Sequence, residues 1–201
     1  NAPDLLQDHT LKACQAAIDA QVGLEEGIAE RERLGRPVFR ARIGLALGPV
    51  LVGNIGTNAR MDYTVIGDTA NLAARLESLN KFYGTSIMVS DRLHSQVADD
   101  FEWRRLDRAV VVGRRASTDL FELLGNKGAV DAKVLHARDL YDTAMEAYLA
   151  GSFSEAKSGF DAAAKARPGD QAAKVLASRA ATFAVESPGL DWDGVWYHTK
   201  K

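Results

Sequence analysis

A polar pair, Asn71 and Arg75, has the residue types and spacing in this sequence that are best suited to chemistry. The two positions are four apart in a segment of good helix formers, so both side chains are expected on one helix face. An amide can orient a sugar, and a guanidinium can bind oxyanions through two parallel hydrogen bonds. The pair therefore suits a polyphosphate ligand. The spacing alone also fits an ordinary solvated helix face, which is the commoner arrangement.

A short strand, a tight turn and a helix are the elements expected to position this pair. Residues 62–66 (DYTVI) have the β-branched and aromatic content typical of a strand. Gly67 allows the backbone to turn, and Asp68 is predicted to cap the following helix. Asn71 would then lie in the first turns of that helix, close to the end of the strand.

The run YTVIGDTANLAARLE, at residues 63–77, closely resembles the signature of class III nucleotidyl cyclases, the adenylate and guanylate cyclase catalytic domain. The resemblance implies that Asn71 orients the ribose and that Arg75 stabilises charge on the phosphates in the transition state. It places Thr64 where the family reads the purine, and many bacterial adenylate cyclases have threonine there. The implied activity is formation of cyclic AMP and pyrophosphate from ATP for intracellular signalling, with guanylate cyclase as an alternative.

The same resemblance implies two divalent metal ions, Mg or Mn, held by two aspartates on neighbouring strands. Asn1-Ala2-Pro3 looks like the run just after the second metal motif, so both aspartates are expected before this chain begins. No metal ligand is assigned within the chain, because its carboxylates and histidines lack ligand spacing. The family builds its sites between two catalytic domains, which implies a homodimer and an inactive fragment when this chain is alone.

One departure from the family pattern lies in the run VVGRR at residues 111–115. Family members often carry a lysine that binds the triphosphate where this sequence has Val112. Arg114 or Arg115 could bind the phosphates instead, although two solvated arginines in a turn are an equally good interpretation. Val112 therefore supports an alternative function, a degenerate cyclase domain that binds a nucleotide or a partner and regulates.

The remaining pattern of residues 1–125 predicts an α+β sheet with helices on one face, which the resemblance identifies as a partial ferredoxin-like sheet of the cyclase type. A helix is predicted from a cap at Asp8 to about Arg33. Residues 39–47 and 50–56 are predicted to form a hairpin that turns at Gly48-Pro49. The further elements expected are strands over 84–90, 101–112 and 118–124, and a short helix over 91–98 that Asp91 caps.

Residues 126–132 read as a linker, and residues 133–201 as an alanine-rich helical extension with tetratricopeptide-like spacing. Such an extension could be a helical cap or a module that recruits a protein partner, with the sheet domain as a dimerisation scaffold in the latter case. Trp192 and Trp196 in the tail are expected to lie on a hydrophobic surface. The ending DWDGVW resembles the C-termini of some bacterial sensor cyclases that are anchored in the membrane.

The composition of the chain restricts the classes of protein to which it can belong. The chain has 201 residues, 46% of them hydrophobic and 26% charged, as expected of a globular protein. A net charge of −2 gives no indication of nucleic acid binding, and no apolar run approaches the roughly 20 residues that span a bilayer. Cys14 is the single cysteine and is expected to be a buried thiol in a reducing compartment. The catalytic part is therefore expected in the cytoplasm. The absence of an initial methionine indicates a piece of a longer protein, and the resemblance to sensor cyclases implies a membrane anchor for it.

Overall fold

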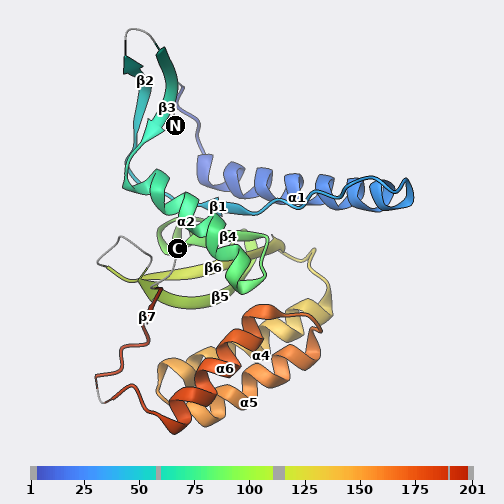
Figure 1. The fold of residues 1–201 in the computed structure, drawn as a ribbon, viewed down its shortest axis with the longest axis vertical. Coiled ribbons are helices and arrows are strands. Elements are labelled where there is room, and N and C mark those ends of the chain that lie inside the picture. Colours follow the sequence, from blue (N-terminus) through green and yellow to red (C-terminus); the bar gives the residue numbers. More distant parts are fainter. Residues whose placement is uncertain (1–3, 58–59, 111–115, 190, 199–201) are drawn as a thin grey trace.

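The computed structural model describes residues 4–57, 60–110, 116–189 and 191–198 (Figure 1). Its helices and strands alternate in an order that confirms the predicted α+β class. In chain order the elements are α1 (His9–Arg33), β1 (Ile43–Leu45), β2 (Leu51–Thr57), β3 (Arg60–Ile66), α2 (Asp68–Tyr83), β4 (Ile87–Ser90), α3 (Asp91–Val97), β5 (Phe101–Val110), β6 (Thr118–Asn126), α4 (Ala132–Leu149), α5 (Phe153–Ala166), α6 (Gln171–Val185) and β7 (Trp196–Tyr197).

Five strands form the main sheet in the order β1-β4-β6-β5-β7, and β2 and β3 form a separate two-stranded sheet. The predicted hairpin between residues 39–47 and 50–56 is therefore wrong. β1 pairs in parallel with β4, whereas β2 pairs antiparallel with β3, with Leu51 opposite Ile66. Only two residues separate β2 from β3, which is the commonest length of a hairpin connection. β2 therefore pairs with β3 and not with the strand that precedes Gly48-Pro49. Figure 1 shows this hairpin projecting from the rest of the molecule.

The main sheet has a hydrophobic core on each face, so the prediction of helices on one face is wrong. β4 shows the reason, because its residues alternate between the two cores. Met88 packs into a core with α2 and α4–α6, while Ile87 and Val89 pack into a core with α1 and α3. A strand that is apolar on both faces must be covered on both faces.

The helical extension shares the first of these cores with the sheet. Leu76 of α2 and Leu106 of β5 pack in the same cluster as Tyr148, Phe160 and Leu176 of the three C-terminal helices. Removing the helices would therefore expose part of this face of the sheet to water, since only α2 would still cover it. The linker boundaries at 126–132 and the tetratricopeptide-like character of the extension stay predictions.

The two tail tryptophans lie on this same core, as predicted. Trp192 packs edge-on against Tyr148 and Phe153, and its indole N–H donates to the Tyr148 carbonyl at 3.1 Å. Trp196 lies in β7, which pairs in parallel with the end of β5. The tail thus returns from the helices to the edge of the sheet.

The long first helix is confirmed, but its predicted cap is wrong. Asp8 has a left-handed backbone conformation, and its side chain makes no capping hydrogen bond. Cys14 is buried as predicted, and burial together with nearby Asp100 raises the pKa of its thiol to about 12. None of the helices in the described ranges is long and apolar enough to cross a membrane.

Candidate functional site

The turn that opens α2 is formed by Gly67. It occupies the N-cap position with a φ of 152°, a conformation that residues with a side chain rarely adopt. Asp68 is the first helical residue and not the cap, which corrects the sequence prediction. Its carboxylate still lies in the first turn, where negative charge interacts favourably with the helix dipole.

α2 presents Asn71 and Arg75 along one flank. The helix buries Leu72 and Leu76 against the sheet, and each member of the polar pair precedes one of these leucines by one residue. The pair is therefore rotated about 100° from the buried stripe, with the two side chains one turn apart. Asn71 is exposed and Arg75 is half-buried, so both can reach a ligand on this flank.

Arg75 has an unpaired donor in this position. Its Nη1 atom is buried without a hydrogen-bond partner, and the side chain forms no ion pair with another described residue. Leaving a charged donor buried and unpaired is costly, so a ligand that accepts a hydrogen bond from it would be stabilised there. A planar guanidinium matches a phosphate group, which can accept two parallel hydrogen bonds.

α2 is held close to the sheet at its middle. Gly44 of β1 lies against the helix backbone at Ala73 and Glu77, where a β-carbon would overlap the helix. One turn further on, the buried Asn80 side chain donates to the carbonyl of Ile43 at 2.9 Å and accepts from the Thr85 hydroxyl. Sequence reasoning missed Gly44 and Asn80, because nothing in a glycine or a helical asparagine indicates which element it will contact.

Thr64 lies on the projecting hairpin, just before α2. It is exposed, and in the β2–β3 register it stands opposite Gly53. The structure thus places Thr64 on the strand that leads directly into the helix of Asn71 and Arg75. Arg114 and Val112 lie outside the described residues.

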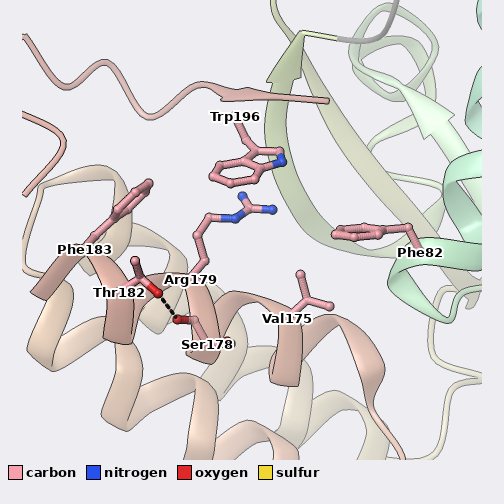
Figure 2. Close-up of a pocket in the computed structure, with 7 residues that line it drawn as sticks. All are labelled: Phe82, Val175, Ser178, Arg179, Thr182, Phe183 and Trp196. Carbon is pink, nitrogen blue, oxygen red and sulfur yellow. Dashed lines mark hydrogen bonds between the residues drawn. The ribbon is translucent and has the colours of Figure 1, made fainter. Parts of the chain in front are cut away.

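Two other features of the structure bear on possible ligand sites. Among the described parts of the chain, no group of three or more histidine, cysteine, aspartate or glutamate residues could hold a metal ion. A hollow of about 250 Å³ lies at the other end of α2 (Figure 2). Its walls are mainly apolar and contain none of the predicted site residues; they are formed by Phe82, Val175, Ser178, Arg179, Thr182, Phe183 and Trp196.

Comparison with known families agrees with the geometry of α2 and its hairpin. Residues 4–125 match the sequence profile of the adenylate and guanylate cyclase catalytic domain. The chain belongs to this family. The match contains the β2–β3 hairpin and all of α2, and it ends where the helical extension begins.

Two relatives of similar sequence are named as adenylate cyclases. Adenylate cyclase 1 of Rhizobium meliloti (strain 1021) is 37% identical over 131 residues, which are 65% of this chain and 20% of that protein. An adenylate cyclase of Anabaena cylindrica is 33% identical over 118 residues, 55% of this chain and 24% of that protein. The chain thus spans about a fifth to a quarter of these relatives.

Solved cyclase structures share the fold. The guanylyl cyclase Cya2 aligns with a TM-score of 0.54 and 28% identity, covering 64% of this chain and 64% of its own. The adenylyl cyclase CyaB from P. aeruginosa aligns with a TM-score of 0.55 and 25% identity, covering 65% of this chain and 67% of its own. The cyclase family is therefore supported by fold as well as by sequence.

Proposed function

We propose that this chain is part of a class III adenylate cyclase that forms cyclic AMP and pyrophosphate from ATP. The observation that carries the proposal is the unpaired, buried Nη1 atom of Arg75, one helical turn from Asn71 on the same flank of α2. The relatives named as adenylate cyclases and the threonine at position 64 favour ATP as the substrate.

In this reaction the ribose 3′-hydroxyl attacks the α-phosphorus, and pyrophosphate leaves. Negative charge develops on the phosphate oxygens, so fixed cationic donors aimed at them lower the barrier. Arg75 would supply such donors, and Asn71 would hold the ribose so that its hydroxyl faces the phosphorus. Thr64 would contact the purine from the neighbouring strand.

Cyclase catalytic domains generally use divalent metal ions. The described residues of this chain offer no ligand set for them. We assign two divalent ions, Mg or Mn, to the intact enzyme because the family implies them, and the steps above use only this chain's own side chains. By this assignment the chain contributes the ribose- and phosphate-binding half of a composite site.

A second protomer would supply the other half. The hairpin that carries Thr64 has three large apolar residues on its surface. The exposed fractions of Leu51, Met61 and Tyr63 are 68%, 61% and 60%. A lone two-stranded hairpin is marginally stable in water, so an apolar hairpin that projects from the fold needs a partner surface. We propose that the partner is a second copy, in a homodimer located in the cytoplasm with its substrate.

Substitution of the polar pair in the full-length protein tests this proposal. Asn71→Ala and Arg75→Ala should each lower kcat roughly tenfold or more, because each removes contacts made in the transition state. Arg92→Ala, which removes an exposed arginine on α3, should retain the wild-type rate. Wild-type rates in both site variants would refute the site assignment.

The substrate and the alternatives are separated by assaying the wild-type protein with each nucleotide. Formation of cyclic AMP from ATP supports the proposal, and a preference for GTP would make the protein a guanylate cyclase. The likeness to Cya2 keeps that second substrate open. Nucleotide binding without any cyclic product would instead support a degenerate, regulatory cyclase domain.

A further inference from the structure

A buried polar network joins the helical extension to the far end of α2. The Tyr83 hydroxyl donates to Asp107 Oδ2 at 2.6 Å, and Arg179 Nη1 donates to the same oxygen at 2.7 Å. The backbone N–H of Arg108 donates to the other carboxylate oxygen at 2.9 Å. Tyr83 belongs to α2, Asp107 to β5 and Arg179 to α6, so one carboxylate links three elements.

Every charged or hydroxyl group in this network is shielded from water. The side chains of Asp107 and Arg179 are 0% and 5% exposed. Burial raises the pKa of Tyr83 well above its ordinary value, so its hydroxyl stays protonated and remains a donor. Figure 2 shows Arg179 extending from α6 to the ring of Trp196, which its guanidinium carbon approaches to 3.9 Å. The tail strand β7, at the edge of the sheet, thus covers the guanidinium of Arg179.

Because its charges are buried, the network allows only a narrow range of positions for the three elements that it joins. A buried carboxylate and guanidinium lose their hydration, and this cost is recovered only when the hydrogen bonds have good geometry. Displacing Tyr83 from Asp107 would leave a carboxylate oxygen with one fewer donor in a site that water does not reach. The end of α2 therefore has one strongly preferred position relative to β5 and α6.

The position of this helix end affects the orientation of the flank of α2 that carries Asn71 and Arg75. Tyr83 is eight residues beyond Arg75 in one continuous helix, a distance of about 12 Å along the axis. Gly44 and Asn80 fix the middle of the helix against β1. A contact at the middle still allows small rotations of the helix, and a second contact at its end removes them.

We propose that Asp107 and Arg179 are positioning residues for the Asn71–Arg75 pair, acting through Tyr83 and the rigid body of α2. The inference rests on the proposed cyclase function. It gives the helical extension a part in the site, although the extension lies beyond the residues 4–125 that match the family. Arg179 contributes nothing to the substrate directly.

Tyr83→Phe in the full-length protein is the main test, because it removes one hydroxyl and keeps the ring. We expect kcat to fall about tenfold, with KM for ATP changed less than about threefold, since the bound substrate would face misaligned groups. Arg179→Lys should lower kcat by a smaller factor, because the ammonium can still pair with Asp107 but loses the planar guanidinium that lies over Trp196.

Arg138→Gln is the matched control. Arg138 also joins the extension to β5, by an ion pair with Glu102 at 3.0 Å, and its other hydrogen bonds go to Trp103 of β5 and Asp139 of α4. This variant should lose thermal stability and keep the wild-type kcat. A wild-type kcat in Tyr83→Phe, or an equal loss of kcat in Arg138→Gln, would overturn the proposal.

Amide hydrogen exchange of residues 68–76 provides a readout that does not depend on activity. Exchange should be faster in Tyr83→Phe than in Arg138→Gln. If the wild-type protein makes no cyclic nucleotide, the proposed function fails, and this exchange difference alone still decides whether the network positions α2. Equal exchange in the two variants would overturn the positioning role.

Discussion

Replacing Gly44 by alanine tests how closely the catalytic helix must lie on the sheet. The new β-carbon would overlap the Ala73 carbonyl oxygen and the Glu77 amide nitrogen of α2, and would lie 3.0 Å from the Leu76 β-carbon. Ordinary carbon contacts are about 3.5–4.0 Å, so the Leu76 contact alone requires a shift of roughly 0.5–1 Å. The two overlaps with backbone atoms cannot be relieved by a rotamer change, so α2 itself must move by at least about 1 Å.

The two consequences of this movement have different magnitudes. Overpacking of this kind lowers the free energy of unfolding by about 1–3 kcal/mol, a fall in Tm of roughly 3–10 °C for a chain of this size. Misplacing catalytic groups by about 1 Å can lower a rate by up to about 100-fold. Gly44→Ala should therefore leave a folded protein whose kcat is roughly 10–100-fold below that of the wild type.

Thermal unfolding and cyclase assays on the full-length protein measure both effects. Gly23→Ala on α1 is the control, because its β-carbon would have no neighbour within 4 Å. This control should retain wild-type activity and should not lose stability, since alanine is a better helix former than glycine. Wild-type activity and an unchanged Tm in Gly44→Ala would refute the argument that α2 is held by close contact with β1.

Three further predictions concern stability and thiol chemistry. Asp170→Ala should lower the free energy of unfolding by about 3–5 kcal/mol in urea titrations, because it removes a buried partner of Arg104 and the N-cap of α6; a loss below about 0.5 kcal/mol would contradict it. Cys14 should not react with thiol reagents at pH 8 until urea unfolds the chain, since its pKa is raised to about 12 by burial; rapid labelling of folded protein would count against this. Burial of one Asp142 oxygen raises the pKa of that carboxyl to about 6, so the folded state binds the proton more tightly than the unfolded state. Stability should therefore fall as pH rises from about 4 to 6, and Asp142→Asn should raise Tm at pH 7 but not at pH 4; an equal Tm change at both pH values would exclude this carboxyl as the cause.

The helix of the polar pair could be predicted from the sequence because the signal is local. Helix formers, a glycine turn and a spacing of four residues define α2 and the relation of Asn71 to Arg75 without reference to other elements. The burial of both tail tryptophans could be predicted for a similar reason, because large apolar side chains need a surface to cover them.

The strand pairing and the buried network could not be predicted, because they depend on non-local contacts. In an unbroken strand, Arg104 and Asp107 would face opposite sides, since side chains alternate. A register shift between Arg105 and Asp107 leaves an extra residue in β5 and turns both charged side chains toward the helical extension. A charged residue in a strand normally indicates exposure. Here each one pairs with a residue far away in the chain: Arg104 with Asp170 at the N-cap of α6, and Asp107 with Arg179 on α6.

A complementation assay tests whether this chain supplies the Asn71–Arg75 half of a composite cyclase site. The chain would be mixed with the full-length protein carrying Asn71→Ala and Arg75→Ala, and cyclic AMP would be measured with ATP and Mn²⁺. We expect a rate above that of either component alone, because the variant still provides the metal-binding half. No product from the mixture, with circular dichroism showing that the chain is folded, would contradict it.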